Sequence, residues 1–503
     1  MTATTDLRCQ QLQQQHDDTR PTRMSKNTIS TTSLRLLATA VAFMLSFTAQ
    51  AMVYEVSPEG TPYSLIAALA EAGPGDTISL ADGTYRDPII TMAGGEEGSP
   101  VVIEGGPGAV ITAFCGDKNE MWSQKVVDVR HSWITLLGFT VDGKLDDEDT
   151  EDSYVNKCVF IEGQAEPTMR EYHGSAVNSS LIGFVMDGLH ITNCGEECVR
   201  ARNWVTHSVI SNNFIENCGI KDFRFESNDK VGEAIYLGTS SNQWTTFPND
   251  INYKEFAGEG YPDESNYNLI TGNTLTPRGN ECVDVKEGAS FNVIEYNECS
   301  EQLDKESGCY DSRGNENTFR YNTASKCNGG GIRLGGHEKY GVVYGVNNIV
   351  YGNVFEDTND GSIKSMNEPQ GFICGNSCSG SGDCDVREEG DEEIESTWDQ
   401  HCPETLPTVP YIDHEVPAPA PTPEEMPVAE TTAPVDAPVA ETSAPVAAPV
   451  AETTAPVAAP VAETTAPVAA PVAETTAPMA APVAETSSPV PAPVAETSSP
   501  VAA

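Results

Sequence analysis

The middle of the chain is a series of short apolar segments that each end in asparagine. These segments end at Asn193, Asn213, Asn273, Asn297, Asn322 and Asn353. Intervals of 20, 24 and 25 residues fit one coil of a parallel β-solenoid, and the intervals of 60 and 31 residues fit coils that carry inserted loops. The pattern therefore predicts stacked coils with asparagine at one corner.

A second short strand is expected after each asparagine, and these strands align with one another. Their central apolar residues form one column: Val199, Ile235, Val283, Tyr310, Ile332 and Ile363. Such a column is what a buried stack requires. A β-sandwich is the alternative, but its strands would alternate in hairpins with tight turns. We predict an all-β fold, a right-handed parallel β-helix, over residues 52–375.

The start of this region reads as a cap. Residues 63–72 have the apolar spacing of an amphipathic helix that would cover the open end of the solenoid. Residues 74–85 would then supply the first strand and turn.

The N-terminus reads as a secretory signal. Residues 36–47 are an apolar run of 12 residues, too short to span a bilayer, and Ala49-Gln50-Ala51 follows. We interpret 1–51 as a signal region whose true start is Met24, and we expect no membrane span. The mature protein should be secreted, extracellular or in the cell wall.

The C-terminus is a low-complexity array. Within 415–503, glutamate recurs every eleven residues from Glu430 to Glu496 in repeats of the form AETTAPVAAPV. Frequent proline and the lack of aromatic residues predict a disordered, extended stalk that could attach the protein to a cell wall. A solvated tail without a partner is the alternative. A Cys-containing acidic segment, 376–414, precedes it.

Deleting residues 415–503 should leave the stability of the folded part unchanged within about 0.5 kcal/mol, because such repeats bury no core. Thermal melting of the truncated and full chains would measure this. A large drop in melting temperature would show that the repeats pack on the folded part.

Charge limits the kinds of partner that the protein can bind, and cysteine content indicates disulfides. The chain has 28 Lys and Arg against 75 Asp and Glu, which excludes a nucleic-acid binder that depends on phosphate neutralisation. Thirteen of the 14 cysteines follow the signal, so disulfides are expected and an odd thiol would remain. The best candidates for disulfides, with metal binding as the alternative, are Cys374, Cys378, Cys384 and Cys402.

Polar residues in the aligned strands should project outward, because alternate residues of a strand face opposite sides. One outward column contains Lys286 and Arg313. The column before it contains Arg200, Tyr236, Asp284, Asp311, Arg333 and Lys364. Coils are ~4.8 Å apart, so Lys286 and Arg313 should be stacked neighbours. The position that opens each strand adds Glu233 and Glu281.

This arrangement has a catalytic and a structural interpretation. A neighbouring cation disfavours protonation, so Arg313 should lower the pKa of Lys286 and let that lysine act as a general base. Arg313 would then stabilise developing negative charge. Alternatively, Lys286 and Arg313 form a salt-bridged ladder with Asp284 and Asp311 that merely satisfies the sheet surface.

At these residues the sequence resembles polysaccharide lyase family 6, which contains β-helix alginate lyases and chondroitinase B. The segments that carry the resemblance are ECVDVK (281–286), SRGNENT (312–318) and GGGIRLGG (329–336), with GDTISLADGTY and GSPVVIEG (98–105) near the start. The resemblance implies that Lys286 and Arg313 are catalytic and that Glu281 binds Ca²⁺. Gly279 stands where the family has a second acidic ligand. A calcium ion would therefore need Asn280, Glu233 or Asp284.

The implied reaction is β-elimination on an anionic, uronate-containing polysaccharide, with Lys286 removing the proton beside the sugar carboxylate. The candidate substrate contacts are Asp284, Asp311, Arg333, His337 and Trp244. Alternatively, His337 is a surface residue without a role in binding, and Trp244 packs its loop onto the coils. A glycoside hydrolase using Asp284 and Asp311, an alginate epimerase, and a non-catalytic glycan-binding protein are the alternative functions.

Overall fold

The computed structural model describes residues 51–112, 124–163, 180–226, 230–244, 262–380, 386–388 and 402–403. The predictions for the signal region, for the repeats in 415–503 and for most of 376–414 fall outside the described residues and stay predictions. The chain divides into two compact units, residues 1–425 and 426–503, and every described residue belongs to the first.

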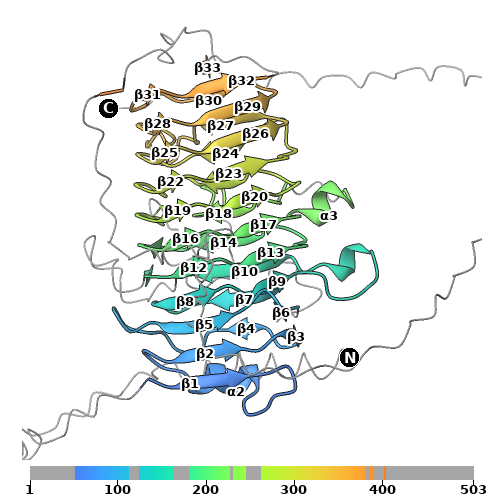
Figure 1. Ribbon diagram of the computed structural model, residues 1–503. Coiled ribbons are helices and arrows are strands. Elements are labelled where there is room, and N and C mark those ends of the chain that lie inside the picture. Colours follow the sequence, from blue (N-terminus) through green and yellow to red (C-terminus); the bar gives the residue numbers. More distant parts are fainter. Residues whose placement is uncertain are drawn as a thin grey trace, which may run out of the picture. The chain divides into compact units, whose positions relative to one another are not determined.

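The described residues wind into a stack of coils with three long parallel sheets, which we call A, B and C (Figure 1). A complete coil contributes one strand to each sheet, in the order A, B, C, and all the strand pairs in these sheets are parallel. The predicted right-handed parallel β-helix is thus confirmed.

The strands of each sheet are adjacent in the order given. Sheet A contains β1 (Val53–Val56), β2 (Thr77–Leu80), β5 (Val101–Gly105), β8 (Ile134–Leu137), β12 (Val185–Asp187), β16 (Val209–Ser211), β19 (Leu269–Thr271), β22 (Val293–Glu295), β25 (Thr318–Arg320), β28 (Ile349–Tyr351) and β31 (Ile373–Cys374). Sheet B contains β3 (Gly83–Tyr85), β6 (Ala109–Ile111), β9 (Thr140–Asp142), β13 (His190–Thr192), β17 (Phe214–Glu216), β20 (Thr274–Thr276), β23 (Glu298–Ser300), β26 (Thr323–Cys327), β29 (Val354–Thr358) and β32 (Ser377–Ser379). Sheet C contains β4 (Ile89–Ile90), β7 (Lys125–Val129), β10 (Lys157–Glu162), β14 (Val199–Arg202), β18 (Ile235–Leu237), β21 (Val283–Val285), β24 (Gly308–Ser312), β27 (Gly330–Leu334), β30 (Ile363–Ser365) and β33 (Val386–Glu388). The remaining elements are α2 (Leu65–Glu71), the 3-10 helix η2 (Glu151–Ser153), α3 (Ile220–Phe223), and the pair β11 (Leu181–Ile182) and β15 (Val205–Thr206).

The interior of the stack is lined by the predicted apolar column of sheet C. Its members pair in register from β14 to β30, and all six are fully buried: Val199, Ile235, Val283, Tyr310, Ile332 and Ile363. Since strand side chains alternate between faces, this column fixes which neighbours face away from the core. The candidate site residues of sheet C therefore follow from the register.

The predicted asparagine ladder is present at the corner between sheets A and B. From Asn213 to Asn376, each side-chain amide donates to the side-chain oxygen one coil on, at 2.9 to 3.0 Å, in the order Asn213, Asn273, Asn297, Asn322, Asn353 and Asn376. These amides also bond backbone groups, so the corner buries few unsatisfied polar atoms.

A second asparagine ladder, which we did not predict, lies at the start of the sheet A strands. Asn268 donates to Asn292 at 3.0 Å, and Asn292 donates to Asn317 at 3.0 Å. The backbone N–H of Asn317 then donates to Asn348 at 3.0 Å. Both ends of each sheet A strand in this region are therefore fixed by amide stacking.

The structure corrects the predicted coil in two respects. A coil has three strands: β20 lies between Asn273 and β21, so the aligned strands with the candidate residues are the third of each coil, not the second. Asn193 is not part of the ladder. The residue that corresponds to Asn213 one coil earlier is Leu189, whose backbone N–H donates to the Asn213 side chain at 2.9 Å.

The predicted helix is confirmed as α2, with Ser64 as its N-cap and Leu65, Ala68 and Leu69 buried against the first coil. The first strand, however, is β1, which precedes the helix and pairs with β2. It was missed because VYEV lies so close to the expected cleavage point.

Five disulfides join described cysteines: Cys158–Cys194, Cys198–Cys218, Cys282–Cys299, Cys309–Cys327 and Cys374–Cys402. Only the last was among the candidates; Cys378 is also disulfide-bonded. Each closes a loop of 17 to 36 residues, which typically adds about 2 to 4 kcal/mol of stability. No described cysteine is free, and the odd thiol, which would have to lie outside the described residues, stays a prediction.

These disulfides fit an extracellular protein. Within the described residues, no helix has both the length and the apolar character needed to cross a bilayer.

Candidate active site

The outward face of sheet C carries the predicted row of polar side chains. Register places six residues on successive coils: Arg200, Tyr236, Asp284, Asp311, Arg333 and Lys364. The face is less open than expected, because Asp284 and Asp311 have no exposed surface. Charges buried in this way must be paired or bind an ion.

Lys286 and Arg313 lie on neighbouring coils, directly after β21 and β24, since Val285 pairs with Ser312. The Lys286 ammonium forms an ion pair with the Asp284 carboxylate and lies 4.4 Å from the centroid of the Tyr236 ring. Only 6% of the Lys286 side chain is exposed. The base candidate is thus held between a carboxylate and an aromatic face.

The expectation that stacking with Arg313 lowers the pKa of Lys286 is wrong in its net result. Burial and the Arg313 charge do lower that pKa, but Asp284, Tyr236 and Glu233 outweigh them and raise it above its usual value. The prediction included the neighbouring cation but not the carboxylates that close around the ammonium.

Arg313 is the more accessible of the two cations, with 20% of its side chain exposed. Its Nε donates to Asp311 Oδ2 at 3.3 Å, and no described residue bonds to its two terminal nitrogens. A guanidinium presented in this way can bind a carboxylate with two parallel hydrogen bonds.

An acidic cluster lies beside Lys286. Glu233, Glu281 and Asp284 each place a carboxylate oxygen within 4.8 Å of the others, and all three are buried. Burial raises the pKa of Glu233 to about 8 and, together with Asp284 and Asp311, raises that of Glu281 to about 7. Three carboxyl groups so close together favour a cation among them.

Two oxygen atoms of this region lack a described hydrogen-bond partner although they are buried: Asp284 Oδ1 and Asn280 Oδ1. Leaving such atoms unpaired is costly. Calcium prefers six to eight oxygen ligands of this hard, carboxylate and amide type. The residues present therefore fit calcium, which Glu233, Glu281, Asp284 and Asn280 would hold.

Gly279, the departure from the family pattern, has a steric cause. A Cβ at this position would lie 2.4 Å from the backbone oxygen of Gly232 and 2.7 Å from that of Cys218. No acidic side chain could be placed there without moving the preceding coil. The cluster draws its third carboxylate from Glu233 instead.

Arg333 does not project freely from its coil. Its Nε donates to Asp311 Oδ1 at 3.1 Å, and Nη2 forms an ion pair with the other oxygen of the same carboxylate. Burial alone would raise the pKa of Asp311, but Arg333 and Arg313 hold it below its usual range. Asp311 thus orients both guanidiniums.

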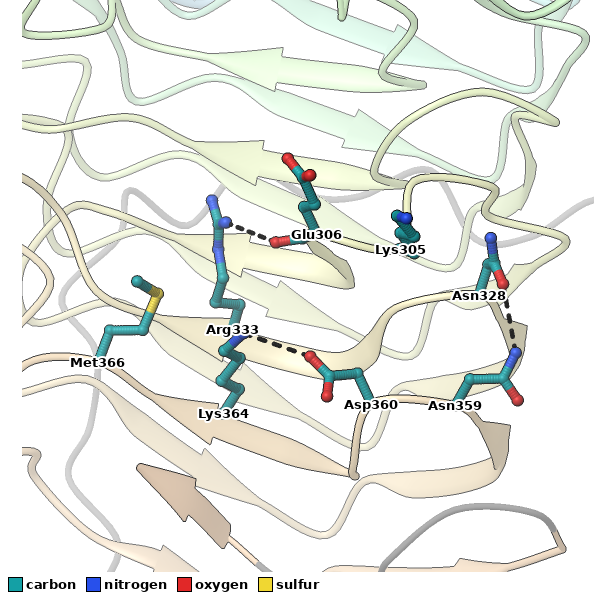
Figure 2. A pocket seen from close by; sticks show the side chains of 8 residues that line it. All are labelled: Lys305, Glu306, Asn328, Arg333, Asn359, Asp360, Lys364 and Met366. Carbon is teal, nitrogen blue, oxygen red and sulfur yellow. Dashed lines mark hydrogen bonds and ion pairs between the residues drawn. The ribbon is translucent and has the colours of Figure 1, made fainter. Parts of the chain in front are cut away.

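A pocket of about 570 Å³ continues along this face (Figure 2). Its lining residues are Lys305, Glu306, Asn328, Arg333, Asn359, Asp360, Lys364 and Met366. Arg333 Nη1 donates to the backbone oxygen of Glu306 at 3.0 Å, and Lys364 bonds Asp360 at 3.3 Å. The lining has three cations against two carboxylates, in a chain whose net charge is −47.

His337 lies on the coil after Arg313, with its Nδ1 2.7 Å from Glu287 Oε1 and 53% of its side chain exposed. Trp244 is fully buried. Its Nε1 donates to the backbone oxygen of Thr239 at 2.9 Å, and its ring packs edge-on against Tyr344 at 5.6 Å. The ring packs its loop and presents no surface to a sugar; Phe247, Tyr253, Phe256 and Tyr261 of the same insert lie outside the described residues.

Sequence reasoning missed Tyr236 and Glu287 as members of the site. Tyr236 stood in the predicted outward row, and Glu287 follows Lys286 directly, so both signals were available. Ser307, which donates to Glu281, gave no sequence signal because it belongs to the loop before β24.

Comparison with solved structures finds the same fold in an alginate lyase from Paenibacillus sp. str. FPU-7. The TM-score is 0.50 at 19% identity, over 67% of this chain and 98% of that one. The chain shares its fold with a polysaccharide lyase. Two more distant matches have lower TM-scores. Pectate lyase Pel9A has a TM-score of 0.37 and 14% identity, over 68% of this chain and 79% of that one. A mannuronic acid specific family 6 lyase from human gut microbiota has a TM-score of 0.36 and 16% identity, over 67% of this chain and 79% of that one.

No model of a known protein family matches the chain, and no curated protein matches it. At 19% identity the comparison shows the fold. A shared fold does not determine the chemistry, which depends on the residues of the site.

Proposed function

We propose that the protein is a secreted polysaccharide lyase that cleaves a uronate-containing polysaccharide by β-elimination. One observation carries the proposal. Lys286 and Arg313 occupy matching positions on two neighbouring coils, beside three clustered carboxyl groups. No described residue bonds to the terminal nitrogens of Arg313. A base, a carboxylate-binding fork and a cation site are the parts that this reaction requires.

Arg313 would bind the uronate carboxylate of the substrate. Its terminal nitrogens can donate two hydrogen bonds, while Asp311 fixes the guanidinium through Nε. This contact strengthens when a proton leaves the adjacent carbon, because negative charge then spreads onto the carboxylate. Arg313 therefore stabilises the transition state more than the bound substrate.

Lys286, as the neutral amine, would remove that proton. Its position is fixed by Asp284 and by the Tyr236 ring, and its burial excludes competing water. When bound at Glu233, Glu281, Asp284 and Asn280, calcium would polarise the substrate carboxylate and offset the acidic charge that keeps Lys286 protonated.

The pocket of Figure 2 would extend this site along the polymer. It lies on the same face, one to two coils beyond Arg313, and is lined by Arg333 and Lys364. An excess of cations at this place suits further carboxylates of an anionic polysaccharide.

A hydrolase that uses Asp284 and Asp311 fits the contacts less well. Asp311 is bound by two guanidiniums and Asp284 by an ammonium. Such pairing lowers the tendency of Asp311 to donate a proton, as a general acid must. An epimerase would share the proton abstraction and differs only in its product.

The test is to incubate the purified full chain with alginate, pectate and dermatan sulfate, with and without a chelator. A lyase generates a conjugated double bond that absorbs ultraviolet light. An epimerase instead changes the ratio of uronate epimers, which NMR detects. Binding to one of these polymers without either product would overturn the proposal and favour a glycan-binding protein.

Replacing Arg313 with alanine should lower kcat/KM on the cleaved polymer by about 10² to 10³-fold, the usual cost of removing a donor to developing charge. Lysine at this position should retain more activity, since an ammonium keeps the charge but not the fork. Steady-state kinetics would measure both variants. Equal activity of Arg313→Lys and Arg313→Ala would contradict a role for charge here.

Replacing Glu281 with glutamine should weaken calcium binding, measured by calorimetry, and lower activity in a way that added calcium partly restores. The matched control is Glu298→Gln, an exposed glutamate on β23 of sheet B. Calcium affinity that is the same in both variants and in the wild type would remove Glu281 from the ligand set.

The repeats of 415–503 are proposed to attach the enzyme to a cell wall, which keeps a secreted catalyst near its polymer. Fractionation of cells that express the full and truncated chains would show whether these repeats retain it.

A further inference from the structure

The contact between His337 and Glu287 joins an accessible imidazole to a fully buried carboxylate. Glu287 Oε1 is 2.7 Å from His337 Nδ1 and also accepts the backbone N–H of His337 at 3.3 Å. Burial alone would raise the pKa of Glu287, but the His337 bond, Arg313, the Ser241 N–H and Lys286 lower it to about 2. The carboxylate is therefore ionised, and it directs the N–H of the ring to Nδ1.

Nε2 of the same ring is left for other partners. No described residue bonds to it, and 53% of the side chain is exposed. An exposed imidazole nitrogen whose ring is oriented by a buried carboxylate is the arrangement that proton transfer to a ligand requires.

This pair borders Lys286 and Arg313. Glu287 directly follows Lys286, and the chain before His337 passes against Arg313. A Cβ at Gly336 would lie 2.5 Å from the backbone oxygen of Arg313 and 3.1 Å from Cγ of Glu287. Glycine at 336 is thus what allows the chain to bring His337 this close to the pair.

The loop that carries His337 is held in place by contacts with Tyr344 and with the loop of Trp244. The backbone N–H of Gly336 donates to Tyr344 at 3.2 Å, and the Tyr344 ring packs on the buried Trp244. Ser241, three residues before that tryptophan, donates its backbone N–H to Glu287 at 3.0 Å. Both loops therefore converge on Glu287, which gives His337 a fixed place.

We propose that the imidazolium form of His337, oriented by Glu287, donates its Nε2 proton to the glycosidic oxygen as it leaves. The inference rests on the proposed elimination and supplies an acid for it, a role that the proposed function gives to neither Lys286 nor Arg313. Glu287 is then a positioning residue, and His337 a catalytic one.

In this step Lys286 takes the proton from the carbon beside the carboxylate, and the electron pair of that bond forms the new carbon–carbon double bond. The bond between the next carbon and the glycosidic oxygen breaks, and its electron pair goes to the oxygen. The imidazolium of His337 gives that oxygen its proton. Exchange with solvent then returns the lysine and the histidine to their starting forms.

The experiment compares two substrates in the full-length protein. One is the uronate polymer that the wild type cleaves; the other is the same uronate carrying a 4-nitrophenyl ether at the carbon β to the carboxylate, so that the leaving oxygen departs as nitrophenolate without protonation. Asparagine is the matched replacement for His337, because its side-chain amide can still donate to Glu287 but has no proton to transfer. His337→Asn should lower kcat on the polymer by about 10² to 10⁴-fold. On the nitrophenyl substrate its rate should stay within a few-fold of the wild type.

The outcomes distinguish a failure of the role of His337 from a failure of the proposed lyase function. A wild type without eliminase activity on either substrate refutes the proposed function. An active wild type together with a His337→Asn variant that is equally active on the polymer, or equally impaired on both substrates, refutes the role of His337 alone. Thermal melting of the variant shows whether it folds; if it does not, His337→Gln is assayed in the same way.

Glu287→Gln provides the readout for positioning. It keeps an acceptor for Nδ1 but replaces the anionic partner of the ring with a neutral amide. Its kcat on the polymer should fall with little change in KM, and the nitrophenyl substrate should be unaffected. A fall on both substrates would instead make Glu287 a clamp for the two loops.

Discussion

Replacing Lys286 with alanine is expected to lower kcat on the uronate polymer by about 10² to 10⁴-fold, the usual contribution of a positioned base. The same loss is expected for Lys286→Arg. Arginine keeps the positive charge beside Asp284 but does not give up its proton near neutral pH. The rate of double-bond formation in the ultraviolet measures both variants.

The arginine variant guards against a trivial explanation, because alanine alone would leave the fully buried Asp284 without its ammonium partner. Lys144→Ala is the matched control. Lys144 follows β9 in the chain, and its ammonium also lies over an aromatic ring, 6.0 Å from the centroid of Tyr154. It should retain full activity. A Lys286→Arg protein that folds and remains active would eliminate Lys286 as the base.

The second large effect concerns stability. Asn297→Ala should destabilise the folded part by about 3 to 5 kcal/mol, because it leaves several buried groups of neighbouring coils unpaired at about 1 to 3 kcal/mol each. Asn297 Oδ1 accepts two N–H groups of Asn273, at 3.0 and 2.9 Å, and its amide donates to Ile270 and Asn322. Denaturant unfolding followed by circular dichroism measures the loss.

The control for this prediction is Asn359→Ala. Asn359 is exposed, and its side chain donates one hydrogen bond of 3.3 Å to Asn328. Its change should stay within about 0.5 kcal/mol. If Asn297→Ala were equally mild, the ladder would be a consequence of coil stacking rather than a cause of its stability.

The register of sheet C could be predicted from sequence, because each strand carries one central apolar residue with polar neighbours at fixed offsets. That pattern placed Asp284 beside Asp311 and Lys286 beside Arg313, as the structure has them. Asn193 was misplaced because an apolar segment ending in asparagine also occurs at the end of β13, one strand further along the coil. Periodicity alone does not distinguish these two corners.

The second ladder was visible in the sequence and overlooked. Asn268, Asn292, Asn317 and Asn348 each stand five residues before an asparagine of the first ladder. The disulfides within the coils were missed for a related reason. Their partners lie on different strands, so their proximity depends on the three-strand coil, which we had predicted with two strands.

The electrostatics of the site could not be predicted, because they depend on burial. Glu233 reaches Lys286 from the preceding coil, and its own pKa is raised chiefly by desolvation. A sequence gives the sign of each charge but not the depth at which it lies. For this reason the direction of the Lys286 pKa shift was wrong, although Arg313, Asp284 and Glu233 had been placed near it.

The disulfides along the stack should help the protein to keep its fold after cleavage by a protease. Cys282 precedes β21 of one coil and Cys299 lies in β23 of the next, while Cys309 in β24 is joined to Cys327 in β26 one coil further. A peptide bond cut anywhere between Cys282 and Cys299 leaves both new ends in one covalent molecule, with the parallel pairing on either side intact. The same holds between Cys309 and Cys327. A nicked chain would thus keep the strands that carry Asp284 and Asp311 in register, so a single cleavage would not release the coils from one another.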